Sequence, residues 1–148
     1  MSLAVTPAPV LRNVLIVDDH EGSRSALGRL LRLSGYHVCQ AMSVQEALAS
    51  AEREPCELLI SDIGLPDGSG VELMRELAAR ARRDGRPMCG IAVSGFTDGD
   101  NIHACAQAGF REFLPKPVSY EKILAAIDRL ARAAPPPASP AVGGASRS

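Results

Sequence analysis

Residues 58–70 read LLISDIGLPDGSG, an apolar run that stops at an acid and passes into glycines and prolines. The three aliphatic residues from Leu58 to Ile60 are too few for a helix and are typical of a buried strand. The glycines and the proline after Asp62 predict an irregular loop up to Val71. An acid before such a loop is common in plain turns. In an open parallel sheet, however, ligands bind outside the carboxyl ends of the strands, which is where this acid would lie.

Composition points to one folded domain. The chain has 148 residues, of which 46% are hydrophobic, and a formal net charge of -1. This balance excludes a whole-protein attraction to nucleic acid or to an anionic membrane. No apolar run is long enough to span a bilayer, and the N-terminus lacks a cleavable signal pattern. We therefore expect a soluble cytoplasmic protein without nucleic-acid or membrane partners.

The cysteines and histidines show no pattern typical of a metal site. The cysteines are Cys39, Cys56, Cys89 and Cys105, without CxxC or Cys/His ligand spacing. We expect them to be small buried hydrophobic residues in a reducing compartment. The histidines His20, His37 and His103 share no spacing, which indicates surface positions rather than metal ligands.

Aliphatic runs of strand length alternate with apolar patterns of helical period. The expected strands cover 13–17, 36–40, 58–60, 88–93 and 111–114, and the expected helices cover about 22–34, 43–53, 71–84, 98–108 and 119–131. Strict alternation predicts a doubly wound α/β fold, a five-stranded parallel sheet with helices on both faces. For this fold 2-1-3-4-5 is one of the common strand orders, and it is the order that we expect. The alanine-rich helix 98–108 should be the least firmly packed. We expect a flexible arm at 1–12, the folded domain at 13–132 and a disordered tail at 133–148.

Polar side chains follow four of the five strands. They are Asp18 and Asp19 after the first, Asp62 after the third, Ser94 after the fourth and Lys116 after the fifth. All should meet at one edge of the sheet, with three carboxylates together because the first and third strands are neighbours. Carboxylates without histidine or cysteine suit Mg²⁺. Alone, the lysine and the serine would be ordinary loop residues, but together with the acids they predict phosphoryl transfer onto Asp62.

Four motifs resemble those of the receiver domain of two-component response regulators. They are VDDHEGSR at 17–24, SDIGLPDGSG at 61–70, AVSGF at 92–96 and FLPKP at 113–117. The resemblance covers residues 13–132 and implies the flavodoxin-like receiver fold. Because the motifs occur together in the right order, the combination is far more specific than any one of them.

The resemblance implies a role for each matching residue. Asp62 matches the phosphoacceptor, Asp18 and Asp19 match the acidic pair that binds Mg²⁺, and the backbone carbonyl of Gly64 joins that coordination. Such a domain catalyses only its own phosphorylation and slow autodephosphorylation. The phosphoryl group would come from a phosphohistidine on a histidine kinase or a phosphotransfer protein.

Other matching residues bind the phosphoryl group, switch or shape loops. Ser94 and Lys116 match the residues that contact the phosphoryl group, and Phe113 matches the aromatic switch, although a plain core role for this ring is an alternative. The loop-shaping positions are Pro66, Gly70 and Pro117, the last after a cis peptide bond, and Arg24 stands where the family often has an arginine. Phosphorylation would remodel the face of the fourth helix, fifth strand and fifth helix, where a downstream protein binds. The resemblance also allows a phosphorylation-dependent homodimer, and it fits either a stand-alone receiver or part of a larger protein such as a hybrid kinase.

Some positions depart from the common family pattern. Gly95 replaces a more usual alanine, and Phe113 lacks the hydroxyl of the tyrosine found in many relatives, so any switch must work by burial of the ring. Gly64 has no side chain to position a hydrolytic water, and Phe96 is bulky enough to shield the phosphate. We therefore expect an aspartyl phosphate that lasts minutes or longer.

The same residues leave two other functions open besides the phosphoacceptor. A Mg²⁺-dependent hydrolase or phosphatase also uses an acceptor aspartate, but it generally needs a second acid to protonate the leaving group. Gly64 occupies the place where that acid would be expected. A degenerate receiver that only binds partners ranks last, because the acceptor, acids, hydroxyl and lysine are all present. Steady turnover of a small phosphate ester would favour the enzyme.

Overall fold

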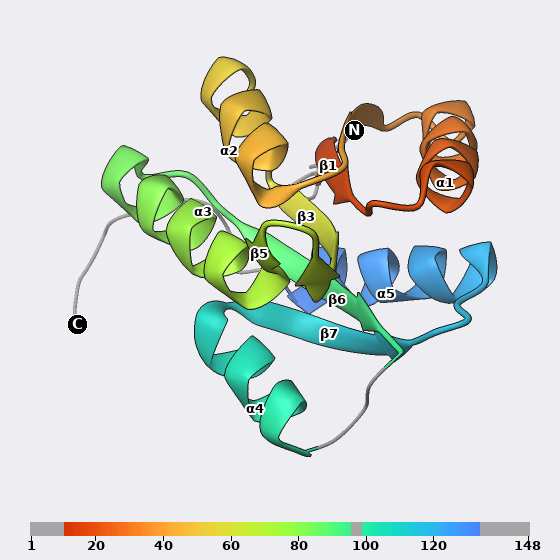
Figure 1. Cartoon of the computed structure of the whole chain (residues 1–148). Helices are drawn as coiled ribbons and strands as arrows, with labels where there is room; N and C mark the ends of the chain where they lie inside the picture. The colour runs from red at the N-terminus through yellow and green to blue at the C-terminus, as the bar shows by residue number, and fades with distance from the viewer. Residues whose placement is uncertain (1–10, 96–98, 134–148) are drawn as a thin grey trace, which may run out of the picture.

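Strands and helices alternate along the chain in this computed structural model, which describes residues 11–95 and 99–133 (Figure 1). In these residues the strands are β1 (Asn13–Val17), β2 (His37–Ala41), β3 (Leu58–Asp62), β4 (Gly64–Leu65), β5 (Gly68–Ser69), β6 (Cys89–Ser94) and β7 (Phe110–Pro115). The helices are α1 (Glu21–Leu33), α2 (Val44–Arg53), α3 (Gly70–Asp84), α4 (Gly99–Ala108) and α5 (Tyr120–Ala133). None of these helices is long and apolar enough to cross a membrane.

The main sheet has five parallel strands in the order β2-β1-β3-β6-β7. In this order they are the second, first, third, fourth and fifth expected strands, so the predicted fold and the strand order 2-1-3-4-5 are confirmed. Strands β1 and β3 are neighbours in register, with Val17 beside Ser61. Their last residues therefore bring the loops that follow them together at one edge of the sheet.

Successive residues of the central strands point into two separate apolar clusters, one on each face of the sheet. Val14 and Ile16 belong to the cluster that α1 and α5 cover, whereas Leu15 and Val17 belong to the cluster that α2, α3 and α4 cover. Figure 1 shows these two groups of helices on opposite sides of the sheet. Burial on both faces explains why β1 is aliphatic from Val14 to Val17.

Several predicted helix ends are present with the expected caps. The hydroxyl of Ser43 accepts a hydrogen bond from the N–H of Glu46 (3.1 Å) and begins α2, and the Ser119 hydroxyl does the same for Lys122 (3.2 Å) before α5. Gly85 ends α3 in the left-handed conformation with φ 69°, which glycine adopts without a steric cost.

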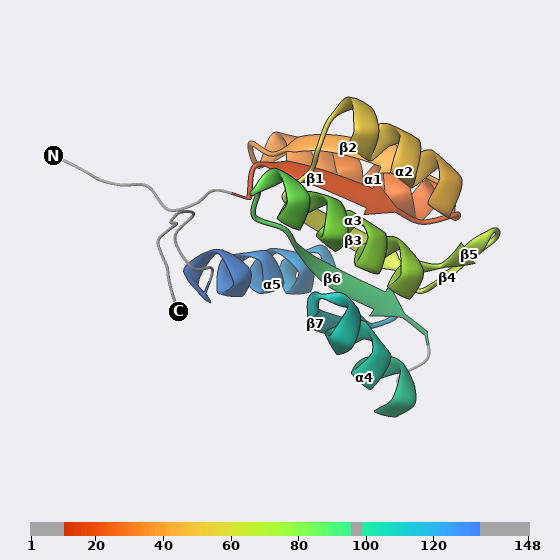
Figure 2. The same cartoon turned by 90° about the vertical axis from the view of Figure 1, so that its left-hand side faces the viewer.

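The expectation of an irregular loop up to Val71 is wrong. Strands β4 and β5 pair antiparallel, with Gly64 opposite Ser69 and Leu65 opposite Gly68. They form a small hairpin that projects beyond the main sheet in Figure 2. Helix α3 then begins at Gly70, one residue earlier than predicted, after the N-cap Ser69. A turn at Pro66–Asp67 makes the hairpin, and proline followed by aspartate and glycine is itself a turn signal.

The other expected boundaries shift by one or two residues. Strand β2 begins at His37 instead of Tyr36, and β7 begins at the buried Phe110. Helix α4 begins at Gly99, and the predicted start at Asp98 lies outside the described residues. Among the described side chains of α4, Cys105 and Ala108 are buried while Ile102 is exposed, in line with the small buried area expected for this helix. The N-terminal arm and the tail stay predictions, since most of both lies outside the described residues.

Candidate functional site

Three carboxylates converge where β1 and β3 end. Asp62 is the last residue of β3, and Asp18 and Asp19 follow β1 directly. One ligand oxygen from each of the three lies within 4.8 Å of the others. The convergence predicted from the strand order is therefore present. Carboxylate oxygens are the only donors in this group, and a donor set of this kind fits Mg²⁺ better than zinc.

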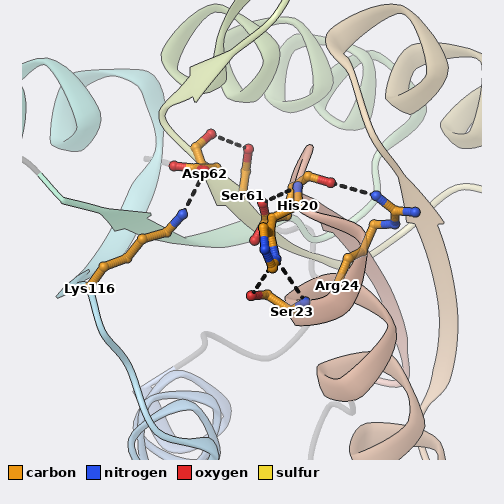
Figure 3. Close-up of polar contacts among 7 residues, drawn as sticks. His20, Ser23, Arg24, Ser61, Asp62 and Lys116 are labelled. Carbon is orange, nitrogen blue, oxygen red and sulfur yellow. Dashed lines mark hydrogen bonds and ion pairs between the residues drawn. The ribbon is translucent and has the colours of Figure 1, made fainter.

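Lys116 points its ammonium group at this cluster. Its Nζ donates a hydrogen bond to Oδ2 of Asp62 over 2.8 Å, as Figure 3 shows. The backbone N–H of Lys116 donates to the carbonyl of Ser94 (2.8 Å), which extends the pairing of β6 and β7 by one residue. The Lys116–Pro117 peptide bond is cis, as the resemblance implies. The end of β7 thus places the lysine across the sheet edge from the acids.

The neighbouring acids raise the pKa of Lys116. Partial burial lowers the pKa of Lys116, but the hydrogen bond to Asp62 and the charges of Asp62, Asp18 and Asp19 outweigh this and raise the pKa above its ordinary value. The ammonium is therefore charged at neutral pH. It offsets part of the repulsion among three neighbouring carboxylates.

Replacing Lys116 by glutamine should lower the thermal stability at neutral pH, because the three carboxylates lose their cation. The pKa of Lys116 is raised in the folded protein, so its contribution is complete below the ordinary lysine pKa and is lost as the pH rises through the raised value. The difference in Tm between wild type and Lys116→Gln should therefore persist at pH 7 and shrink under strongly alkaline conditions. Lys122→Gln, an exposed lysine on α5, serves as the control. A Lys116→Gln variant as stable as wild type at pH 7 would contradict this account.

The loop after β1 is held by the first turn of α1. Oδ1 of Asp18 accepts a hydrogen bond from the N–H of His20 (2.9 Å), and the guanidinium of Arg24 donates to the carbonyl of Asp18 (2.8 Å). His20 in turn caps α1, because its Nδ1 accepts from the N–H of Ser23 (3.2 Å; Figure 3). His20 is exposed, as expected for a surface residue, but it is not incidental, because it caps α1. Its place one residue before the helix was the available signal.

The backbone around Asp62 is fixed by its own neighbours. The buried Ser61 donates its hydroxyl to the carbonyl of Asp62 over 2.8 Å (Figure 3). Gly70 packs so closely that a Cβ there would lie 2.3 Å from the same carbonyl oxygen. Sequence reasoning missed Ser61, although a polar residue inside the run LLISD was a signal.

The other predicted residues are distributed around this core. Ser94 ends β6 and is buried, and Phe113 of β7 is half-buried against the cluster under α2, α3 and α4. Gly64 and Pro66 are exposed in the hairpin of β4 and β5. Phe96, predicted to shield the phosphate, lies outside the described residues.

A pocket of about 710 Å³ adjoins the site. Asp18, Asp62 and Lys116 line one part of it, and apolar side chains such as Leu27 of α1 and Ile123 of α5 line another. The charged groups therefore border open space that a phosphate-bearing group can enter.

Comparison with known proteins agrees with this geometry. A model of the response regulator receiver domain family matches residues 14–128. The chain belongs to this family. Receiver domains act in two-component regulation, and this chain is therefore a two-component receiver domain.

The receiver domain is similar to proteins of several organisms. It is 32% identical over 109 residues to a cyclic di-GMP phosphodiesterase of Thermotoga maritima, covering 73% of this chain but 28% of that protein. A CheY-like receiver domain protein from Methanospirillum hungatei is 32% identical with a TM-score of 0.74, over 83% of this chain and 95% of that one. A response regulator from Burkholderia pseudomallei, solved with a phosphorylated aspartic acid, a calcium ion and citrate, is 31% identical with a TM-score of 0.71, over 82% and 69% of the two chains.

Proposed function

We propose that this receiver domain accepts a phosphoryl group on Asp62 from a phosphohistidine of a histidine kinase or phosphotransfer protein. The observation that carries the proposal is the meeting of three carboxylates within 4.8 Å, with the Lys116 ammonium 2.8 Å from Asp62. Such an arrangement has a nucleophile, a place for a cation and a fixed positive charge at one point. The phosphorylated aspartic acid of the B. pseudomallei relative supports it.

The three acids fit Mg²⁺, and the backbone carbonyl of Gly64 is the fourth protein ligand that we propose. Asp18 and Asp19 are placed by the end of β1, and Asp62 by the end of β3. When bound, the ion supplies positive charge that neutralises the acids and the incoming phosphoryl oxygens. The exposed backbone of Gly64 leaves this side of the site open to water and to a phosphate.

The reaction needs no general base, because the Asp62 carboxylate attacks as an anion. One of its oxygens forms the new bond to phosphorus while the P–N bond of the phosphohistidine breaks, and the imidazole leaves with the bonding electrons. Lys116 moves its hydrogen bond from Asp62 to a phosphoryl oxygen, and the Ser94 hydroxyl contacts another. The product is an acyl phosphate that autodephosphorylates slowly.

Signalling would follow from a shift between two packings of β6 and β7. Ser94 and Phe113 lie on these neighbouring strands, and Phe113 packs in the same cluster as Cys105 and Ala108 of α4. Movement of Ser94 towards the phosphate makes room for the half-buried ring. The face of α4, β7 and α5 then changes, and it is the surface that we assign to a downstream protein or to a second phosphorylated copy.

The proposal is tested by incubating the full chain with acetyl phosphate, with Mg²⁺ or with EDTA, and measuring the intact mass. We expect one added phosphoryl group per chain with Mg²⁺ and none with EDTA. Borohydride reduction of the acyl phosphate, followed by peptide mapping, should mark Asp62. Continued release of inorganic phosphate far beyond one equivalent per chain would favour a hydrolase instead, and absence of any phosphorylation would favour a degenerate receiver.

Adding a polar side chain at Gly64 should shorten the life of the aspartyl phosphate. A Cβ at Gly64 would meet no atom within 4 Å, and the backbone there is not left-handed, so a side chain is accommodated. Gly64→Gln should speed loss of phosphate at least about tenfold by positioning water, less than the roughly 100-fold that a well-placed acid or base supplies. The measurement is decay of ³²P label after removal of the donor, with Gly64→Ala as control. Loss of label from wild type within seconds would contradict the expected long lifetime.

A further inference from the structure

Three side chains with metal-binding atoms meet far from the carboxylate cluster. His37 and Cys39 are the first and third residues of β2, so both point to the same face of this edge strand. Glu54 caps the C-terminal end of α2 beside them. His37 pairs with Asn13 at the beginning of β1, whereas Asp18 follows the end of that strand. The two clusters therefore lie at opposite edges of the sheet.

The contacts among these side chains are direct. Nε2 of His37 lies 2.6 Å from one oxygen of Glu54, and Sγ of Cys39 donates to the other oxygen over 3.2 Å. All three ligand atoms lie within 4.8 Å of one another. Cys39 is half-buried and hydrogen-bonded rather than a fully buried hydrophobic residue, which corrects that expectation. His37 is exposed, as expected for a surface residue, but its ring contacts Glu54. Sequence spacing could not reveal it, because Glu54 comes from a different element.

The separations suit one small tetrahedral ion. Zinc bonds of about 2.0 to 2.3 Å at tetrahedral angles put neighbouring ligand atoms about 3.3 to 3.6 Å apart. The Cys39–Glu54 contact of 3.2 Å needs to open by a fraction of an ångström, and the His37–Glu54 contact of 2.6 Å by up to about one ångström. The side chains of His37 and Glu54 are exposed and can adjust. Imidazole nitrogen, thiolate and carboxylate together are a borderline-soft set, unlike the all-oxygen set at Asp62.

We propose that His37, Cys39 and Glu54 form a Zn²⁺ site with three protein ligands and a fourth position open to water. The site would tie the end of α2 to β2. On binding, the thiol of Cys39 gives its proton to the buffer and its sulfur bonds to the metal, with no change of oxidation state.

The surrounding charges are mixed. The C-terminal end of α2 carries the negative end of the helix dipole, which favours a cation at Glu54. The charges of Arg53 and Arg32 lie nearby and oppose a bound cation. Burial and the neighbouring Glu54 raise the pKa of Cys39, which Arg32 only partly offsets, so the metal must also displace the thiol proton. We therefore expect binding weaker than at closed four-ligand zinc sites.

Cobalt is the probe that tests the site. The full chain, reduced and in excess Mg²⁺ to occupy the acidic cluster, is titrated with Co²⁺ and then with Zn²⁺. We expect one equivalent of Co²⁺ to give a sulfur-to-metal charge-transfer band that Zn²⁺ abolishes. Because the other three cysteines are buried, such a band reports on Cys39. Zn²⁺ should also raise the Tm, since a ligand that binds only the folded state stabilises it.

Matched variants distinguish a metal site from a cluster that only forms hydrogen bonds between β2 and the end of α2. Cys39→Ser should lose the band, and His37→Ala and Glu54→Gln should each weaken binding at least about tenfold, as even outer-shell partners are worth that much. His103→Ala and Glu52→Gln change the same residue types at exposed positions outside the cluster and should bind as wild type does. Absence of the band at one equivalent, its survival in Cys39→Ser, or equal affinity in His37→Ala and Glu54→Gln would overturn the proposal.

Discussion

Replacing Asp62 by asparagine should abolish covalent phosphorylation by acetyl phosphate. The amide keeps the size and shape of the carboxylate but cannot attack phosphorus as an anion, and it can no longer pair with the charged Lys116 ammonium. Intact-mass measurement after incubation with Mg²⁺ should find one phosphoryl group on wild type and none on Asp62→Asn. A beryllofluoride complex, which mimics the acyl phosphate, should be lost in the same variant.

The control is Asp128→Asn. Asp128 lies exposed on α5, where it forms an ion pair with Arg132 one turn away, so its loss should leave phosphorylation unchanged. Circular dichroism should show both variants folded. If Asp62→Asn still gained one phosphoryl group, the acceptor would be a different residue, and Asp18 or Asp19 would be the first to examine because their carboxylates lie beside Asp62.

The sheet could be predicted from sequence because its strands are buried on both faces. In β1 every residue after Asn13 is buried, so the strand reads as an unbroken aliphatic run that is too short for a helix and lacks the alternation of a half-buried strand. The expected order of the strands is one of the common orders of doubly wound sheets, and it is the order observed. The convergence of Asp18 and Asp62 needed nothing more, since it depends on strand order alone.

The β4–β5 hairpin was missed because Gly64 and Gly68 are weak strand residues, although the turn at Pro66–Asp67 is local and was a signal for it. Contacts between distant segments could not be predicted. Asp67 also accepts hydrogen bonds from the N–H groups of Val44 and Gln45, which joins the hairpin to the start of α2. Nothing local to either segment indicates that link.

The same reason explains the residues that hold the site. Lys116 could be placed near the acids, but the contact of its N–H with the Ser94 carbonyl depends on the pairing of β6 with β7. His20 and Ser61 act through hydrogen bonds between their side chains and neighbouring backbone groups, and whether such a bond forms depends on the local backbone geometry. The sequence therefore identifies the charged residues of the site, such as Lys116, more easily than residues such as His20 and Ser61 that hold the surrounding backbone in place.

Replacing Gly70 by alanine should both destabilise the domain and slow its phosphorylation. A Cβ at this position would lie 2.3 Å from the Asp62 carbonyl oxygen and 3.0 Å from the Ser61 hydroxyl. The first contact is with backbone, so it cannot be relieved by turning a side chain. The N–H of Gly70 also donates to the carbonyl of Ile63 (2.8 Å), which fixes α3 against this loop.

Relief of the clash must therefore move either the start of α3 or the peptide that carries Asp62. Overpacking of this kind costs about 1–3 kcal/mol, which denaturant unfolding should detect as a lower free energy of unfolding. A displacement of Asp62 by about 1 Å can slow a positioned reaction roughly 100-fold. We expect Gly70→Ala to show a loss of this order in the rate of phosphorylation by acetyl phosphate, measured below the temperature at which the variant unfolds.

Gly64→Ala is the matched control, because it makes the same change in the same segment where a Cβ would meet no atom within 4 Å. Its free energy of unfolding and its rate of phosphorylation by acetyl phosphate should both be close to those of wild type. Equal losses in both variants would mean that the segment tolerates no added side chain, whatever the space. A Gly70→Ala protein with wild-type stability and rate would mean that the approach of α3 to the Asp62 carbonyl does not position the acceptor, since the backbone would then have moved without consequence for the chemistry.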